Sequence, residues 1–445
     1  MAITLYLILI LLAVAIIMGG MREPARIYQF PFGAATVFLG FIVPQLFGLL
    51  RTDYFPKWAL ERYIFMCILC LLMCWLGDFS AQRRGSRNIR STKYDPTRWL
   101  AGATLLILVG GLAFLKNRSL FHDEFDMSTG ITVAVNFFVT LLRYGFIMAL
   151  IHLLRSRSRY ALVLVLLASL FYLERIVFLG RRHDAVEFAF VLAGSVWFAS
   201  HRILPRPVVI GGIVVGTLVL FSTGAYRSIA VSRSSERDWS RLSDMNLVDT
   251  FKKVTAEGGS EVIAGIYLTT AAANAPLDFG LSNWNGIVYH YVPAQVFGST
   301  FKESLHLPVP NLLAIAKRRY GYIKSSASTV TGMVDCYASF WYLGCLKFFI
   351  IAYIMRRLYR RAIDANIIAQ SLYLFMMTGA LHAITHSTHW FVSPWIQMLV
   401  FWIPVMFYTF KRSATIHPVS LWKTHAASNY FPSYWSLSSR SSASD

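Results

Sequence analysis

Long apolar stretches alternate with short polar segments along most of this chain. Each stretch holds enough apolar residues to approach the roughly 20 that a helix needs to cross about 30 Å of hydrocarbon. The sequence therefore predicts an all-α polytopic membrane protein with about eleven transmembrane helices. The apolar windows lie at 2–18, 33–50, 60–77, 99–115, 128–152, 161–179, 185–200, 208–224, 336–355, 367–386 and 394–410.

The positions of basic residues predict how these spans are oriented across the membrane. Clusters of Lys and Arg follow the first, third, fifth, seventh, ninth and eleventh windows, as at Arg155, Arg157 and Arg159. Because Lys and Arg accumulate in cytoplasmic loops, we expect an external N-terminus and a cytoplasmic C-terminus. The first window lacks a basic n-region and a small-residue cleavage site, so we interpret it as a retained helix rather than a signal peptide.

The alternation is interrupted once, over residues 225–335. This segment is too long for a simple connection and too apolar for a disordered one. It predicts a partly helical cap on the outer face, with helices near 244–253, 261–273 and 311–319. The chain then divides into an N-terminal bundle of about eight spans (1–224), the cap (225–335), about three C-terminal spans (336–410) and a flexible, Ser-rich cytoplasmic tail (411–445).

Composition agrees with this division. Hydrophobic residues make up 56% of the chain and charged residues 14%, which excludes a soluble globular enzyme. The formal net charge of +20 is large enough to suggest nucleic acid. Its placement at the ends of spans instead favours a lipid bilayer as partner and no nucleic acid.

The five cysteines do not form a disulfide framework. Cys67, Cys70 and Cys74 share one face of the third span and are expected to pack as small apolar groups. A disulfide between Cys336 and Cys345 is not expected.

Charged residues near the end of the sixth span are the first candidates for chemistry. Glu174 and Arg175 are followed by Arg181, Arg182 and His183. If the helix continues, Arg175 and Arg182 lie on one face about 10 Å apart along its axis, a spacing that fits a pyrophosphate. The alternative is an arginine ladder that reaches lipid head groups, with Glu174 as counter-ion.

Arg143 lies deep in the fifth span, where a charge needs a buried partner. It either contacts substrate or forms a structural pair with Glu174.

His382, His386 and His389 have the i, i+4, i+7 spacing of one helical face near the outer surface. Neutral imidazoles can take a proton from a hydroxyl or bind a sugar; interfacial packing is the alternative. A metal is disfavoured because no carboxylate or cysteine lies nearby in the sequence. The segment HDEFD (122–126) could hold a divalent ion but is more typical of a solvated loop. We therefore predict no metal and no cofactor.

The cap adds arginines and aromatic residues that suit phosphates and sugar rings. The alternative is an ordinary folded loop with an aromatic belt at the membrane surface. Under the predicted topology these residues and the histidines converge on one outer face. The cap residues are Arg227, Arg233, Arg237, Arg241, Trp239, Trp284, Tyr289, His290, Tyr291 and Tyr320.

Several segments resemble the bacterial oligosaccharide repeat-unit polymerases of the O-antigen polymerase type. They are the second span opening PFGAATVFLG, then LGRRHDAVEFAFVLAGSVWF, VYHYVPAQVFGSTFKES and TGMVDCYASFWYLGCLKFFIIAYIMRRLYRR. The likeness extends over residues 1–412. It departs at the acidic residue usual between TGM and YLG, which corresponds to Asp335 at best, so no catalytic carboxylate is carried over.

The resemblance implies polymerisation of undecaprenyl-pyrophosphate-linked repeat units at the periplasmic face of a bacterial inner membrane, for O-antigen, capsule or exopolysaccharide. A chain-length regulator and a flippase would be partners. Substrate binding is assigned to Arg175, Arg181, Arg182, Arg227, Arg143, His389 and Tyr291, and general-base catalysis to His382, His386 or His183. A ligase or other lipid-linked glycosyltransferase, and a transporter or flippase, are the alternatives; no internal repeat supports the transporter.

Overall fold

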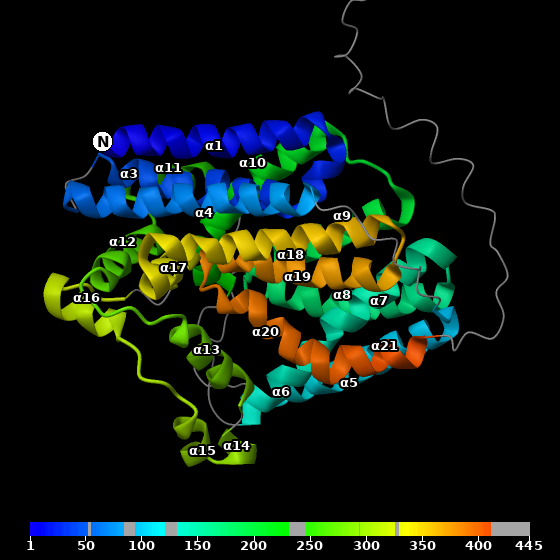
Figure 1. Ribbon diagram of the computed structural model, residues 1–445. Helices are drawn as coiled ribbons and strands as arrows, with labels where there is room; N and C mark the ends of the chain where they lie inside the picture. The colour runs from blue at the N-terminus through cyan, green and yellow to red at the C-terminus, as the bar shows by residue number, and fades with distance from the viewer. Residues whose placement is uncertain are drawn as a thin grey trace, which may run out of the picture.

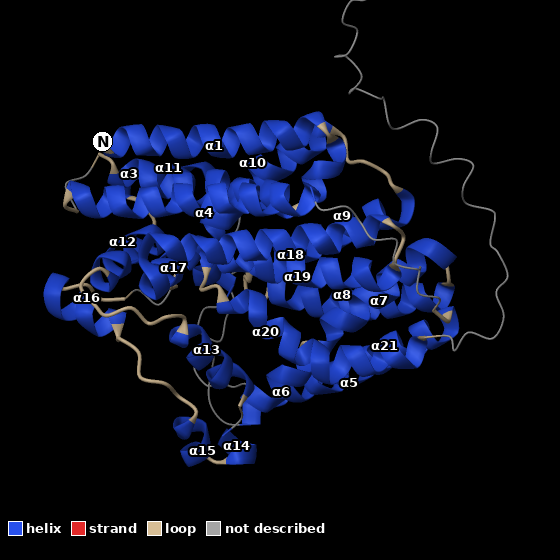
Figure 2. Ribbon diagram, in the orientation of Figure 1, coloured by secondary structure: helices blue, strands red, loops and turns tan. Residues whose placement is uncertain are grey.

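The computed structural model describes residues 1–51, 55–83, 94–292, 294–324 and 329–410 apart from 121–130 and 231–245. Within them every named element is a helix, and the only β contact is an isolated bridge between Tyr94 and Phe410 (Figure 2). In this described part of the chain, nine helical segments are long and apolar enough to cross a membrane. The predicted all-α, multi-pass membrane architecture is confirmed at this level.

The N-terminal part is a run of helices of membrane-spanning length. Helices α2 and α3 are joined without a break by the π-helical turn η2 (Phe38–Ile42), and Thr140 alone separates α6 from α7. The elements are α1 (Ala2–Arg22), η1 (Pro24–Tyr28), α2 (Phe30–Val37), α3 (Val43–Leu49), α4 (Lys57–Arg83), α5 (Pro96–Leu120), α6 (Ile131–Val139), α7 (Leu141–Ser156), α8 (Arg159–Val177), α9 (Arg182–Ser200) and α10 (Arg206–Ala230).

The predicted cap contains short helices. The expected helices near 261–273 and 311–319 are confirmed as α12 and α16, and the one near 244–253 lies a few residues later as α11. They are α11 (Leu247–Glu257), α12 (Ser260–Ala272), α13 (Leu281–Tyr291), α14 (Ala294–Phe297), α15 (Ser299–Ser304) and α16 (Leu312–Tyr320).

Three further segments follow the cap, and two of them are interrupted. The first is α17 (Gly332–Phe340), the 3-10 turn η5 (Trp341–Cys345) and α18 (Leu346–Ile363). The second is α19 (Ile367–Thr385). The third is α20 (His389–Gln397), the π-helical turn η6 (Met398–Trp402) and α21 (Ile403–Thr409).

Two of the eleven predicted spans are not among the nine. The window at 185–200 falls in α9, whose first turns carry Arg182, Asp184 and Glu187. The window at 208–224 falls in α10, where the apolar stretch is the shorter Arg206–Ser222. For these two helices, crossing the membrane stays a prediction.

The long helices lie roughly parallel, and the cap helices α12 and α16 lie at the end where α1 begins, while α13 lies nearer α20 (Figure 1). Helix α4 packs along α18 so closely that a Cβ on Gly77 would lie 2.3 Å from the Phe349 carbonyl oxygen, which requires glycine there. Cys67, Cys70 and Cys74 are buried in this core as predicted. All five cysteines are free, so the expected absence of a Cys336–Cys345 disulfide is confirmed.

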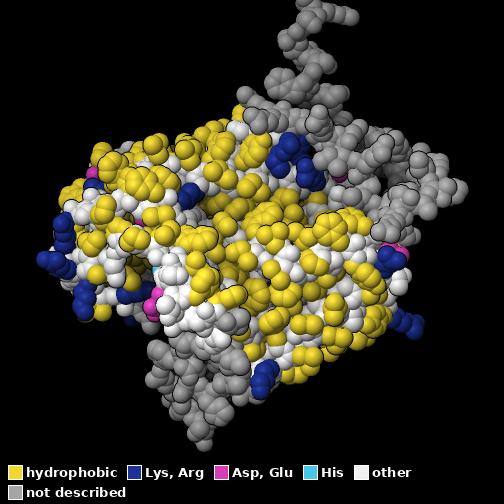
Figure 3. All heavy atoms as spheres, turned by 60° about the horizontal axis from the view of Figure 1, so that its bottom comes forward, with side chains coloured by type: hydrophobic (Ala, Val, Ile, Leu, Met, Phe, Trp, Pro, Cys, Tyr) yellow, Lys and Arg dark blue, Asp and Glu magenta, His cyan; other side chains and the backbone are white. Residues whose placement is uncertain are grey.

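Apolar side chains also cover much of the outside. Figure 3 shows one face on which hydrophobic side chains fill a broad area while Lys and Arg lie toward its edges. Helix α8 alone exposes Leu162, Leu166 and Leu170 to more than two fifths of their full area. Such a surface indicates a lipid bilayer as its surroundings.

Candidate functional site

The connection between α8 and α9 positions the first group of candidate residues. Helix α8 ends at Val177, and Gly180 adopts a φ of +55° before α9 begins at Arg182. The helix does not continue, so the condition under which Arg175 and Arg182 would share one helical face is not met. Glycine permits this left-handed turn without a Cβ clash, and the turn brings α9 back against α8.

Arg143 and Arg175 are held by two buried acids from α9. Arg143 Nη2 lies 2.6 Å from Asp184 Oδ1, and its Nη1 lies 3.1 Å from Glu187 Oε2. Arg175 Nε donates to the second Asp184 oxygen at 2.8 Å. Of the two roles considered for Arg143, the structure supports a structural pair, and its carboxylate partners are Asp184 and Glu187 of α9.

Tyr172 completes this network, donating to Glu187 Oε1 at 2.8 Å. Asp184 is completely buried and Glu187 nearly so. Buried charges of this kind are tolerated only when each is paired and hydrogen-bonded. We define Arg143, Arg175, Asp184, Glu187 and Tyr172 as the acid–arginine cluster.

Arg182 points away from that cluster and joins α9 to the cap. Its guanidinium forms a close ion pair with Glu261 at the start of α12 and lies over the ring of Phe41, 5.0 Å from the ring centroid. The Arg182 side chain remains 29% exposed, so it is accessible from the adjoining cavity. The backbone N–H of Arg181 donates to the Arg175 carbonyl at 3.0 Å.

The three histidines of the predicted helical face are not on one helix. Helix α19 ends at Thr385, His386 has extended backbone angles, and His389 is the first residue of α20. That prediction is wrong because the chain turns at residues 386–388. His382 and His386 nevertheless remain neighbours, with ring centroids 3.9 Å apart.

His183 joins this pair from α9. Its ring centroid lies 4.1 Å from that of His382, and its Nε2 lies 3.6 Å from Glu187 Oε2. The Trp390 indole stacks on the His382 ring at 4.8 Å between centroids. Residues distant in the sequence therefore present three imidazoles, those of His183, His382 and His386, to one place.

His386 is neutral near pH 7. Burial, followed by the charge of Arg182, lowers the pKa of His386 to about 4. Its Nδ1 and the Thr385 hydroxyl lie 3.0 Å apart. A neutral imidazole can accept a proton.

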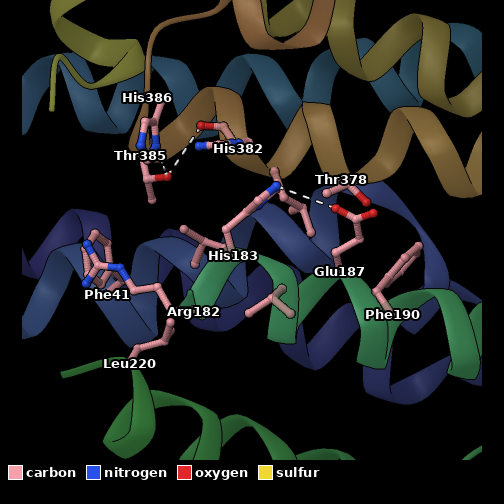
Figure 4. Close-up of a pocket in the computed structure, with 13 residues that line it drawn as sticks. Phe41, Arg182, His183, Glu187, Phe190, Leu220, Thr378, His382, Thr385 and His386 are labelled. Atoms are coloured by element: carbon pink, nitrogen blue, oxygen red, sulfur yellow. Dashed lines mark hydrogen bonds and ion pairs between the residues drawn. The ribbon is translucent and has the colours of Figure 1, made fainter. Parts of the chain in front are cut away.

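A cavity of about 100 Å³ connects these groups (Figure 4). Arg182, His183, His382, His386 and the Glu187 carboxylate line it together with two threonines, and apolar residues from α2, η2, α9, α10 and α19 form the rest of the wall. We call it the arginine–histidine pocket. Its lining residues are Val37, Phe41, Arg182, His183, Val186, Glu187, Phe190, Leu220, Thr378, Leu381, His382, Thr385 and His386.

A second, larger cavity of about 450 Å³ lies beneath the cap helices. We call it the cap pocket. Asp335, one of its lining residues, is only 3% exposed. Lys347 Nζ lies 3.1 Å from Asp335 Oδ1, and the Thr388 backbone N–H donates to Oδ2 at 2.9 Å. His389 also lines this cavity, so it is separated from His382 and His386, which line the other.

The other aromatic candidates help to hold the cap. Trp284 Nε1 donates to the Leu305 carbonyl at 2.9 Å, and Lys302 Nζ donates to the Tyr289 carbonyl at 2.9 Å. Burial raises the pKa of Tyr291 to about 12, and its ring packs edge-on against Phe137. The Tyr320 hydroxyl accepts from Asn274 at 3.1 Å. His290 stacks near His389, at 5.7 Å between centroids.

Several predicted residues are not placed. Arg227 lies in α10 and its side chain is not described; Arg233, Arg237, Trp239, Arg241 and the HDEFD segment (122–126) lie outside the described residues. Tyr291 lines neither of the two pockets.

One set of side chains has the spacing of a metal site. Ligand atoms of His183, Asp184 and Glu187 all lie within 4.8 Å of one another. Arg143 and Arg175 already compensate these carboxylates, and a cation would have to displace both guanidiniums. The donor set therefore fits an arginine better than a metal ion.

Sequence reasoning did not single out Asp184, Glu187 or Glu261. Glu187 lies within the apolar window at 185–200 and Asp184 directly before it, and acids in or beside a predicted span are functional or structural markers by default. The sequence therefore contained a signal for Asp184 and Glu187. Glu261 offers no comparable signal, since it opens a helix of the cap.

No protein-family model, curated protein or solved structure matches this chain.

Proposed function

We propose that this protein polymerises oligosaccharide repeat units carried on undecaprenyl pyrophosphate, at the periplasmic face of a bacterial inner membrane. The observation that carries the proposal is the arginine–histidine pocket. It combines an arginine and three imidazoles with an apolar wall built from helices of the membrane bundle. A polyprenyl pyrophosphate has the same division between a charged head and an apolar chain.

The reaction joins an acceptor hydroxyl to the donor sugar. The hydroxyl oxygen forms a bond to the anomeric carbon, while the bond from that carbon to the pyrophosphate oxygen breaks. The bonding electrons leave with the pyrophosphate, and the hydroxyl proton passes to a neutral imidazole. His386 is suited to this role because its pKa of about 4 keeps it unprotonated at neutral pH.

Arg182 is the arginine best placed to stabilise the leaving pyrophosphate. It lines the pocket and its side chain is 29% exposed. A guanidinium that gains interaction as negative charge develops lowers the barrier. Its pairing with Glu261 also links the pocket to α12, so binding of an anion would be coupled to the position of the cap.

Arg143 and Arg175 have a different role in this proposal. Their guanidiniums are bound by Asp184 and Glu187, so they fix the start of α9 rather than grip the substrate directly. They act as positioning residues for Arg182 and His183, which follow the same turn.

Deletion of the gene, followed by glycan profiling, tests the proposed function. Loss of a polymerase should leave surface glycan that carries a single repeat unit. A ligase would instead leave polymer on its lipid carrier, and a flippase would trap repeat units inside the cell. Either of these two profiles, or unchanged long chains, would overturn the polymerase proposal.

The variant Arg181→Ala with Arg182→Ala tests the site itself. Loss of one donor to a developing negative charge costs about 10²- to 10³-fold in rate, so long chains should disappear while the protein level is maintained. Arg318→Ala with Arg319→Ala, an exposed arginine pair on α16, is the matched control and should leave chain length unchanged. Normal long chains from the first variant would refute the pyrophosphate assignment.

A further inference from the structure

We infer that the cap pocket binds the terminal sugar of the acceptor chain, while the arginine–histidine pocket holds the pyrophosphate end of the donor. This inference rests on the proposed function and deepens it by giving each substrate its own cavity. It starts from the chemistry of the two linings.

The two cavities differ in the charged residues that line them. The lining of the arginine–histidine pocket includes Arg182, three imidazoles and the ion-paired carboxylate of Glu187. The lining of the cap pocket includes the carboxylates of Asp278 and Asp335, of which Asp335 is paired with Lys347, and includes no Lys or Arg. A pyrophosphate therefore meets a guanidinium in the first lining and two carboxylates in the second. The cap pocket therefore fits an uncharged or amino-bearing ligand.

The polar groups of the cap pocket are those that bind sugar hydroxyls. Asp278 is 6% exposed and Asp335 is 3% exposed, so both carboxylates lie within a buried wall, and the Asp335 oxygens are already bonded to Lys347 and Thr388. The Asn283 amide, oriented to satisfy its neighbours, donates to Asp335 Oδ1 at 2.9 Å and accepts from Lys347 Nζ at 3.0 Å. Ser282, Asn311 and Ser387 add further polar groups to the lining.

Apolar side chains form the remaining wall of the cap pocket. They come from α12, α16 and the segments beside them, and they suit the C–H face of a sugar ring. The volume of about 450 Å³ lies within the range of about 300–1,000 Å³ typical of small-molecule sites. The apolar lining residues are Leu268, Ala272, Pro276, Val309, Pro310, Leu312, Leu313, Val330 and Ala338.

Consecutive residues of one turn separate the two cavities. Thr385 and His386 line the arginine–histidine pocket, whereas Ser387 and His389 line the cap pocket. Between them, Thr388 donates both its backbone N–H and its hydroxyl to Asp335. The two cavities are therefore neighbours that share this turn as a wall.

A soluble acceptor separates the two binding events. Mild acid releases the repeat oligosaccharide from lipid extracts of the deletion strain. The released compound lacks pyrophosphate, so it can accept a sugar but cannot donate one. Its binding to the purified full-length protein in lipid nanodiscs is measured by saturation-transfer NMR, which reports the sugar that contacts protein. We expect the signal to be strongest on the terminal, non-reducing sugar.

Variants that fill one cavity test the assignment. Ser282→Trp and, separately, Val309→Trp place an indole in the cap pocket and should weaken acceptor binding at least tenfold. Val186→Trp fills the arginine–histidine pocket and should leave acceptor binding unchanged while weakening binding of the lipid-linked donor. Leu307→Trp, a half-exposed position two residues from Val309, is the matched control and should change neither.

The outcomes distinguish this inference from the proposed function. Acceptor binding that survives both cap-pocket variants, or that is lost only in Val186→Trp, would overturn the inference and leave the polymerase proposal standing. Absence of acceptor binding to the wild-type protein would also overturn it. If the surface glycan of the deletion strain does not carry a single repeat unit, the proposed function itself fails. Two cap-pocket variants on different segments guard against misfolding of either one.

Discussion

The acid–arginine cluster and the Asp335–Lys347 pair are two buried charge networks. They compensate their buried charges in different ways. In the first, two carboxylates and two guanidiniums from α7, α8 and α9 share their contacts, and each charge has more than one partner or neighbour. In the second, one carboxylate meets one ammonium, and backbone and side-chain donors supply the remaining bonds.

This difference separates the roles of the two networks. The cluster fixes the start of α9 and so places Arg182 and His183 at one pocket. The Asp335 pair fixes the turn at 386–388 against α17 and so forms the wall of the other. A buried network that is fully paired rigidifies its surroundings. Each network therefore supports one of the two cavities, and variants in each should have separable effects.

The largest effect is expected from Asp184→Asn. This change leaves Arg143 and Arg175 without the carboxylate that bridges them, and removing one partner from a buried ion pair costs about 3–5 kcal/mol. The measurement is thermal unfolding of the detergent-solubilised protein, followed by size-exclusion chromatography. Asp249→Asn, whose carboxylate is 65% exposed, is the control and should unfold as the wild type does. Equal stability of Asp184→Asn would show that the cluster does not fix α9.

Lys347→Met should have a smaller effect. Asp335 loses its cation but keeps the Thr388 donors, so we expect a loss of about 1–3 kcal/mol in the same unfolding assay. Adding Asp335→Asn to Lys347→Met removes the unpaired charge and should restore part of the stability. A double variant that is less stable than Lys347→Met would contradict the interpretation that Asp335 and Lys347 compensate each other as a pair.

Gly180→Ala tests the turn on which the cluster depends. A side chain at a φ of +55° costs about 1–2 kcal/mol, and strain there should also lower transfer activity by moving Arg182. Gly111→Ala in α5, where a Cβ meets nothing within 4 Å, is the matched control and should be neutral or slightly stabilising. If Gly180→Ala is as stable and as active as the wild type, the conformation of this turn does not determine the position of Arg182.

The last prediction concerns pH and the turn shared by the two pockets. The pKa of His386 is about 4 in the folded protein against about 6.5 when unfolded. The unfolded state therefore binds more protons between these values, so stability should fall as pH drops from about 6.5 toward about 4. His386→Gln should flatten this part of the profile, and His201→Gln, at an exposed position, should not. An identical slope in His386→Gln would assign the pH dependence to other groups.

Much of the fold could be predicted from the hydrophobic pattern, because few backbone structures can span a membrane. Apolar windows of sufficient length predicted the helices, and the interruption at 225–335 predicted a helical cap whose α12 and α16 agree with the structure. The helices do not continue through Gly180 and His386. Pattern alone does not distinguish a helix that continues from one that turns within a polar segment.

The sequence predicted the types of residue that form the candidate site better than it predicted their contacts. His183, His382 and His386 do converge, as does Arg182. The partners of Arg143 and Arg175 were missed because ion pairing depends on which faces of α7, α8 and α9 meet. His389 was grouped with the other histidines by spacing, yet the structure places it on the lining of the cap pocket.

The sequence by itself determined that this chain forms apolar helices, where its cap lies and which charged residues needed partners, since hydrophobicity and the cost of burying charge act on local composition. Only the tertiary structure decided which acid meets which arginine and that one turn separates two cavities with different linings. Those features arise between segments distant in the sequence, where packing sets distances that no spacing of residues records.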